Sequence, residues 1–171
     1  RLNGDASNLA LNPWREDFVE IIRSPDYVGN VQAYCAPPAA ADAALLDGAA
    51  CGAGVAHCYL APDGKVYPCV QFPAVCGDLR RQDFAEIWRN SPQLAELRAL
   101  RNRDLPVCSA CSHLSVCSRC PGLALMEGDV RGPSWADCEK SYARTGMVPT
   151  GRPELARGKF RYWQPKHAVC D

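Results

Sequence analysis

The cysteine spacing between residues 108 and 120 constrains this chain more than any other feature of its sequence. Cys108, Cys111, Cys117 and Cys120 follow the pattern C-x2-C-x5-C-x2-C. Two cysteines separated by two residues can direct both sulfur atoms at one metal, a geometry that suits zinc and iron–sulfur sites alike. Two such pairs in one short segment indicate a fold that is organised around metal centres.

The cysteine count favours metal thiolates over disulfides. The chain has eleven cysteines among 171 residues, and an odd number does not suit a fully paired disulfide framework. The sequence contains no signal-peptide core and no apolar stretch of roughly 18 residues that could span a membrane. We therefore expect a cytoplasmic protein in a reducing compartment, without a membrane partner.

Charge and composition exclude some partners and limit the core. Lys+Arg and Asp+Glu both number 19, so no basic excess points to nucleic acid or to an anionic membrane. The hydrophobic fraction of 47% includes much alanine and cysteine, which bury little apolar surface. We expect metal centres to contribute to the stability of such a chain.

A β-hairpin is predicted over residues 56–70. Segments 56–60 and 66–70 flank a turn that contains Asp63-Gly64, a strong signal for a two-residue hairpin loop. If Asp63-Gly64 is that loop, Cys58 lies directly opposite Cys69. Directly opposed β-carbons are about 4.5–5.5 Å apart, so the two thiolates could share one metal centre.

Several short helices complete the predicted elements. The pattern predicts a helix over 14–22, a helical turn over 42–46, a helix over 84–89, one that begins at Ser91-Pro92, and a last one over 134–144. Residues 104–122 are predicted to be irregular. The fold class is therefore α+β, a small irregular domain with one β-hairpin and several short helices.

The cysteine-bearing segments together resemble the SPASM domain, the C-terminal extension of many radical S-adenosylmethionine enzymes. That family has the pattern C-x9–15-G-x4-C, then C-x2-C-x5-C-x3-C, then a last cysteine. Here twelve residues separate Cys51 from Gly64, four separate Gly64 from Cys69, and Cys138 follows the array. Residues 77–79, 84–88 and 90–92 also look like the linking region of the family. The array departs from the pattern because its last pair is C-x2-C.

The resemblance implies two iron–sulfur clusters of the [4Fe–4S] type with interleaved ligands. The family often has a cysteine shortly before its first motif cysteine, and here none lies nearer than Cys35. Cys58 or Cys76 could fill this place, the hairpin geometry favours Cys58, and an open site with three ligands is the other alternative. The first set of ligands is then Cys51, Cys58, Cys69 and Cys120, and the second set is Cys108, Cys111, Cys117 and Cys138.

The resemblance also implies a division of the chain and a role for it. Residues 51–144 correspond to the SPASM-like domain, residues 1–50 to a connector from a preceding catalytic barrel, and residues 145–171 to a C-terminal tail. The chain has no C-x3-C-x2-C motif. S-adenosylmethionine and a third cluster would therefore belong to an upstream catalytic domain, and this chain alone is not expected to cleave S-adenosylmethionine. The chain is either the C-terminal part of such an enzyme, as its accessory domain, or a stand-alone relic of one.

The implied function is electron transfer or substrate anchoring in a maturase that modifies a peptide or builds a cofactor precursor, including a tetrapyrrole. The alternative is a zinc-binding interaction module with two four-cysteine sites. His113 lies inside the array and could be a ligand. Because the thiolates already suffice, we interpret it as a loop histidine near a metal centre.

Overall fold

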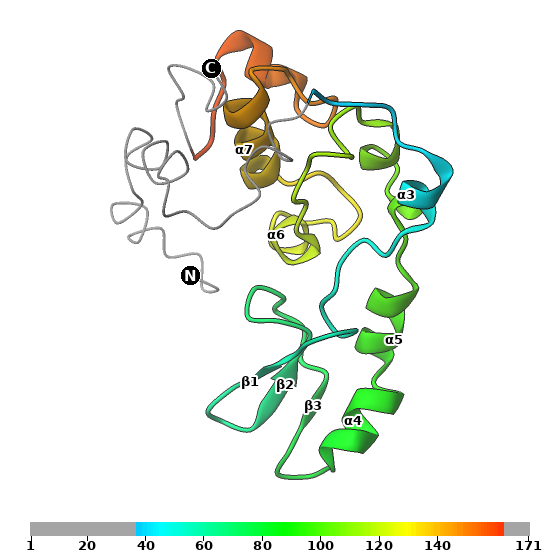
Figure 1. Cartoon of the computed structure of the whole chain (residues 1–171). Coiled ribbons are helices and arrows are strands. Elements are labelled where there is room, and N and C mark those ends of the chain that lie inside the picture. The colour runs from blue at the N-terminus through cyan, green and yellow to red at the C-terminus, as the bar shows by residue number, and fades with distance from the viewer. Residues whose placement is uncertain (1–36, 163–171) are drawn as a thin grey trace, which may run out of the picture. The chain divides into compact units, whose positions relative to one another are not determined.

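A computed structural model describes residues 37–162 of the chain (Figure 1). These residues fall into two compact units, which we describe separately. The sheet unit comprises residues 42–109 and 120–132. The α7 unit comprises the described residues 37–41, 110–119 and 133–162. The helix predicted over residues 14–22 lies outside the described part of the chain.

A three-stranded antiparallel sheet forms the first half of the sheet unit. Its strands are β1 (Tyr59–Leu60), β2 (Lys65–Tyr67) and β3 (Gly77–Asp78), in the order β1-β2-β3. Leu60 pairs with Val66 in the first ladder, and Val66 pairs with Gly77 in the second. The predicted hairpin is therefore present, with one strand more than the sequence suggested.

The hairpin register differs from the predicted one. The Ala61 amide donates to the Lys65 carbonyl at 2.9 Å, so the loop has three residues, 62–64. Gly64 occupies the left-handed position at φ 82°, which is typical of three-residue hairpin loops. Continuing this register by one pair beyond Tyr59↔Tyr67 sets Cys58 against Pro68. The prediction that Cys58 lies opposite Cys69 is wrong, because one extra loop residue shifts every cross-strand pair.

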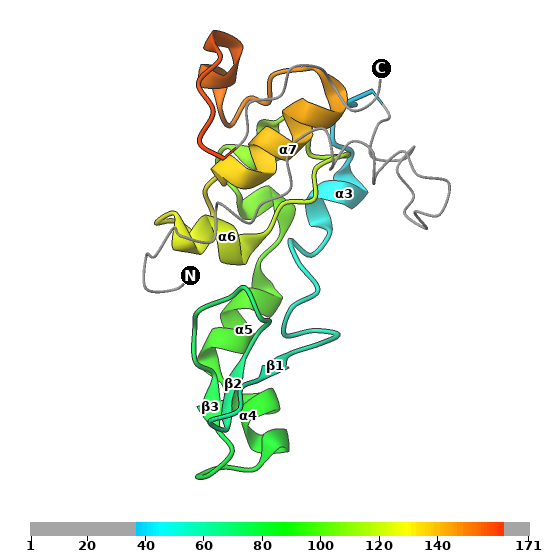
Figure 2. The same ribbon diagram turned by 90° about the vertical axis from the view of Figure 1, so that its left-hand side faces the viewer.

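Two short helices pack along the sheet, α4 (Phe84–Asn90) and α5 (Pro92–Ala99) (Figures 1 and 2). Ser91 separates them: its amide donates to the Ile87 carbonyl at 3.0 Å, and Pro92 then starts α5 at the position where proline is favoured. Both helices were predicted from sequence. Their buried side chains form the second core cluster with the sheet, made of Val66, Cys76, Ile87 and Leu94.

The rest of the sheet unit consists of short helices, 3-10 turns and loops. It includes α3 (Ala43–Asp47), α6 (Pro121–Met126) and the 3-10 turns η2 (Asn102–Asp104) and η3 (Cys108–Ala110). The Asp42 side chain caps α3 by accepting from the Leu45 amide at 2.7 Å, so the predicted helical turn is confirmed. The first core cluster consists of Ala53, Phe72, Leu97, Leu100 and Leu105.

Helix α6 begins within the last two residues of the segment 104–122, which the sequence predicted to be irregular, and extends beyond it. Pro121-Gly122 suggests a turn, but proline is well tolerated at the first helical position. Gly122 allows the helix to approach another segment closely, because an added β-carbon would lie 2.5 Å from the Gln71 carbonyl oxygen. A contact with a residue far away in sequence therefore decides where this helix sits.

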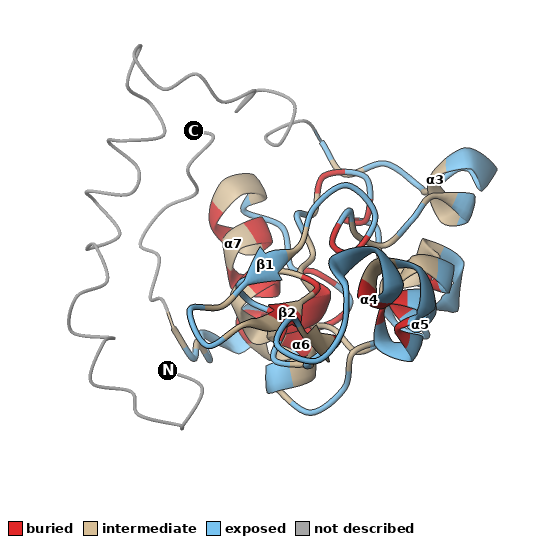
Figure 3. Ribbon diagram, turned by 90° about the horizontal axis from the view of Figure 1, so that it is seen from below, coloured by how far each residue is buried: buried red, intermediate tan, exposed pale blue. Residues whose placement is uncertain are grey.

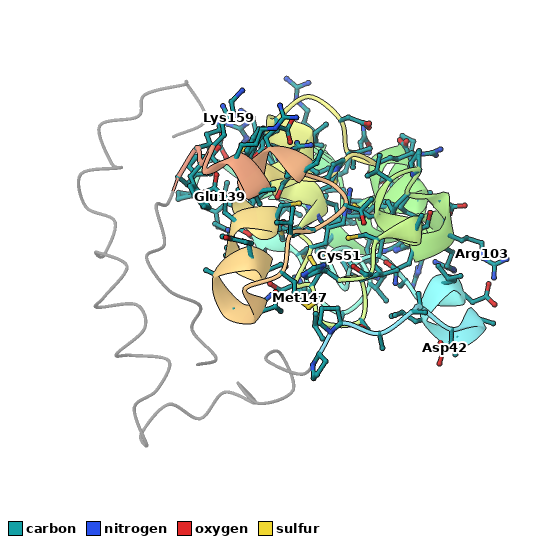
Figure 4. The ribbon with its side chains drawn as sticks, turned by 90° about the horizontal axis from the view of Figure 1, so that it is seen from above. Asp42, Cys51, Arg103, Glu139, Met147 and Lys159 are labelled. Atoms are coloured by element: carbon teal, nitrogen blue, oxygen red, sulfur yellow. The ribbon has the colours of Figure 1, made fainter. Side chains whose placement is uncertain are left out.

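The α7 unit is built on α7 (Trp135–Thr145), with the 3-10 helix η4 (Pro153–Arg157) following it. Ser134 caps α7 by accepting from the Asp137 amide at 3.1 Å, as the sequence predicted. Five residues of α7 are buried (Figure 3), namely Asp137, Cys138, Glu139, Ser141 and Ala143. Among them, Glu139 accepts the Tyr162 amide at 2.9 Å and so binds the segment that follows η4 (Figure 4). None of the helices within residues 37–162 has the length and apolar character needed to cross a bilayer.

Candidate metal-binding site

Nine cysteines lie in the described part of the chain, and no two of them form a disulfide with each other. Cys76 and Cys138 are buried, and the other seven are half-buried. Cys35 and Cys170 lie outside the described residues. Thiolates are soft ligands that suit zinc and iron–sulfur clusters, so the donor chemistry fits the predicted sites.

The sheet unit contains all four predicted ligands of the first set. Cys51 and Cys69 pack against the first core cluster, and Cys58 packs against the second. Cys120 donates through Sγ to the Gln71 Oε1 atom at 3.4 Å. Since Gln71 follows Cys69 by two residues, this contact brings the last cysteine of the array to the segment that carries Cys69.

A tight turn follows Cys51, which is labelled in Figure 4. Cys51 Sγ accepts the Ala53 amide at 3.3 Å, an N–H···S contact of the kind that tunes iron–sulfur clusters. Gly54 follows at φ 71°, and its amide donates to the His57 carbonyl at 2.8 Å. A β-carbon at Gly54 would lie 2.9 Å from Leu94 Cδ2, so glycine is required both by conformation and by space.

Cys76 lies close to Cys58 but in a different environment. Burial raises the pKa of the Cys76 thiol, and the negative charge of Cys58 raises this pKa further. The hydrogen bond with Ser91 and the positive charge of Arg98 lower the same pKa. The net result is a pKa above the usual range, which disfavours the thiolate that a metal needs. His57 is exposed.

The second set is divided between the two units. Cys111, Cys117 and Cys138 belong to the α7 unit, whereas Cys108 belongs to the sheet unit and packs against its first core cluster. Cys138 is 7% exposed on α7, and a β-carbon at Gly151 would approach its Sγ to 3.3 Å. The close backbone at Gly151 therefore covers this thiol.

Within residues 37–162, no three His, Cys, Asp or Glu side chains converge on a point where a metal ion could bind. Thiolates repel one another, and metal binding supplies the free energy that draws them together. Both sets of ligands therefore remain predictions from the sequence. The structure adds which cysteines share a unit and which groups surround each one.

His113 controls the environment of Cys111. Its ring is 1% exposed, and its two nitrogens lie 3.2 Å from Ser112 Oγ and 3.1 Å from Thr145 Oγ1. Both ring nitrogens thus have protein partners, which agrees with the interpretation of His113 as a residue that does not bind metal. Burial raises the pKa of the Cys111 thiol, but hydrogen bonds from His113 and Thr150 outweigh it and lower the pKa to about 7.

The pKa of Cys111 predicts a pH-dependent reactivity in the metal-free chain. About half of the thiol is ionised at pH 7, so its alkylation rate should rise with pH around a midpoint of about 7. This shift stabilises the folded chain above the ordinary thiol pKa, and the stabilisation is lost as the pH falls through about 7. Mass spectrometry of iodoacetamide-treated chain measures the rate, with buried Cys76 as the slow internal control. Equal midpoints for Cys111 and Cys76 would contradict this prediction.

Comparison with known proteins identifies the segment that carries six of these cysteines. The SPASM family, described as an iron–sulfur cluster-binding domain, matches residues 51–112. Residues 51–112 form a SPASM domain. This is the auxiliary domain type of radical S-adenosylmethionine enzymes, as the resemblance in sequence implied. Cys117, Cys120 and Cys138 lie beyond the matched segment.

Three curated relatives of this chain share one name, AdoMet-dependent heme synthase. The relative from Methanosarcina barkeri is 34% identical over 73 residues, 41% of this chain and 20% of the relative. The one from Nitratidesulfovibrio vulgaris is 32% identical over 80 residues, 46% of this chain and 22% of the relative. The one from Oleidesulfovibrio alaskensis is 33% identical over 70 residues, 41% of this chain and 18% of the relative. The matches thus span about a fifth of each relative. No solved structure matches the chain significantly.

Sequence reasoning missed two residues near the cysteines. His113 was interpreted as a loop histidine that does not bind metal, but its hydrogen bonds to Cys111 were not foreseen. Arg98 on α5 donates through Nε to the Gly54 carbonyl at 2.6 Å, 44 residues away in sequence. No local pattern signals such a contact, because the two residues meet only after the sheet unit has folded.

Proposed function

We propose that this chain binds two auxiliary [4Fe–4S] clusters through the first and second sets of cysteines. The observation that carries this proposal is the SPASM match over residues 51–112, a segment with six cysteines, no two of which form a disulfide with each other. When bound, such clusters supply one-electron transfer, or an open iron that anchors a substrate. The residues of this chain hold the clusters, limit their contact with water and set their potentials.

The assignment of Cys120 to the first set has support from geometry. Its thiol contacts Gln71, and Gly122 packs closely against the same residue, so the end of the array approaches the segment of Cys69. In two-cluster ferredoxins, too, the last cysteine of a run ligates the other cluster. The assignment of Cys138 to the second set rests on the family pattern.

The proposed partner is a catalytic radical S-adenosylmethionine domain, which would hold S-adenosylmethionine and a third cluster. The relatives are named heme synthases, and this name favours one of the two substrate classes that the sequence left open. We therefore favour a tetrapyrrole precursor of heme over a peptide. The auxiliary clusters would exchange an electron with this substrate or anchor it during modification.

Metal analysis after anaerobic reconstitution tests the proposed function. We expect about eight iron and about eight acid-labile sulfide atoms per chain, because each [4Fe–4S] cluster contains four of each. The protein should be brown, with broad visible absorption from sulfur-to-iron charge transfer. A colourless chain that retains only zinc would instead establish the zinc-binding interaction module, and the cluster proposal would then be abandoned.

A further inference from the structure

Two contacts fix the guanidinium group of Arg98 in the sheet unit. Its Nε donates to the Gly54 carbonyl at 2.6 Å, and its Cζ lies 4.6 Å from the ring centroid of Trp88. Gly54 belongs to the first motif of the SPASM domain, and Trp88 lies on α4. The planar group is therefore held by the turn that carries Cys51 and Cys58 on one side and by a helix on the other.

Within residues 37–162, one nitrogen of this guanidinium has no acceptor. Nη2 of Arg98 is buried, and none of the described residues accepts a hydrogen bond from it. A buried charged donor without an acceptor costs free energy, and native structures rarely leave one unmatched. The side chain is thus positioned for an acceptor that the described part of the protein does not provide.

The groups around Arg98 indicate what that acceptor is. The positive charge of Arg98 acts on the Cys76 thiol, and the charge of Cys58 acts on the same thiol. Cys58 and Cys76 both belong to the second core cluster and its surroundings, together with Leu94 one turn before Arg98 on α5. A cysteine-rich surrounding and a fixed cation suit a sulfur acceptor that carries negative charge.

We propose that Nη2 of Arg98 donates a hydrogen bond to a sulfur atom of the first cluster and raises the reduction potential of that cluster. This inference rests on the proposed function. Reduction adds one negative charge to the cluster, and a nearby buried cation stabilises the reduced form more than the oxidised form. Hydrogen bonds to sulfur act in the same direction. Arg98 is thus a positioning and tuning residue that does not ligate iron.

Redox titration of the reconstituted 171-residue chain, followed by EPR, tests this inference. In R98Q, the equilibrium constant for reduction of one of the two clusters should fall at least tenfold. This corresponds to a reduction potential that is more negative by about 59 mV for one electron. The other potential should stay unchanged. R89Q is the matched control, since Arg89 is an exposed arginine on the neighbouring helix α4, and both of its potentials should equal those of the wild type.

A second readout covers the case in which R98Q does not assemble its clusters. Wild-type chain with guanidino-¹⁵N-labelled arginine should show ¹⁵N coupling to a reduced cluster in pulsed EPR. R98K retains the charge and the fold but lacks the guanidinium, so this coupling should be lost in labelled R98K. Absence of coupling in the wild type, or its persistence in R98K, overturns the inference.

Iron and sulfide content together with the reduction potentials distinguish failure of this inference from failure of the proposed function. A wild-type chain without iron and sulfide contradicts the proposed function and the inference together. A wild-type chain with two clusters, in which R98Q assembles both clusters with unchanged potentials, contradicts only the role of Arg98.

Discussion

Cys120→Ser is expected to reduce the iron content of the reconstituted chain from about eight to about four atoms. Serine is a poor substitute for a thiolate, and one [4Fe–4S] cluster should be lost when a ligand is removed. The other cluster should remain, because the proposed second set does not include Cys120. Iron and sulfide analysis, with quantitative EPR of the reduced chain, measures the loss.

Double variants show which cysteines share a cluster. Cys69→Ser combined with Cys120→Ser should lose no more iron than either change alone, because both residues belong to the first set. Cys120→Ser combined with Cys138→Ser should lose nearly all iron, since one ligand of each cluster is missing. The reverse result, with Cys120 and Cys138 behaving as one unit, would contradict the interleaved assignment.

The same measurement decides between Cys58 and Cys76 as the fourth ligand of the first set. The observed register removes the cross-strand argument for Cys58. The structure supplies a different argument for Cys58, because its competitor Cys76 is only 9% exposed and burial raises the pKa of the Cys76 thiol. We therefore expect Cys58→Ser to lose about four iron atoms and Cys76→Ser to lose none. Iron loss in Cys76→Ser alone would assign Cys76 instead.

Gly122→Ala is expected to destabilise the chain by about 1–3 kcal/mol, as overpacking substitutions do. The new β-carbon would lie 2.5 Å from the Gln71 oxygen, 2.9 Å from the Gln71 carbon and 3.2 Å from the Phe72 nitrogen. These are backbone atoms, so no side-chain rotation can relieve the clash. Helix α6 must then shift away from Gln71, and the thiol of Cys120, which precedes this helix, should shift with it.

The direction of the stability change in Gly122→Ala distinguishes the close contact with Gln71 from an ordinary glycine-to-alanine change in a helix. Alanine in place of glycine within a helix normally stabilises by roughly 0.5–1 kcal/mol. A lower denaturation midpoint for Gly122→Ala therefore reports the close contact with Gln71. Gly52→Ala is the matched control, because a β-carbon there meets only His57 Cε1 at 3.7 Å. Equal stability of the two variants would mean that α6 does not pack against this segment.

Local chemistry explains why several elements could be predicted from the sequence. Ser91-Pro92 ends α4 and starts α5, and Ser134 caps α7, because caps involve atoms within a few residues of one another. The resemblance to the SPASM family was also confirmed over residues 51–112, because cysteine and glycine spacings are explicit in the sequence. These features need no knowledge of distant contacts.

The hairpin register shows where such prediction ends. Asp63-Gly64 suggested a two-residue loop, but the chain forms a three-residue loop, and the difference moves Cys58 from Cys69 to Pro68. Val66 is fully buried in the observed register, where it packs in the second core cluster. The burial of this side chain agrees with the observed register. The Asp-Gly pair indicates only a preferred loop length and carries no information about which register buries Val66.

The sequence by itself determined that this chain carries a cysteine array of the SPASM type, capped helices and a hairpin, since all of these depend on neighbouring residues. Only the tertiary structure decided the surroundings of the thiols: Gln71 beside Cys120, His113 bonded to Cys111, and Arg98 held by Gly54 and Trp88. The contact of Cys120 with Gln71 joins residues 49 positions apart, and that of Arg98 with Gly54 joins residues 44 positions apart. Their existence depends on burial and close packing, which arise only when the whole unit has folded.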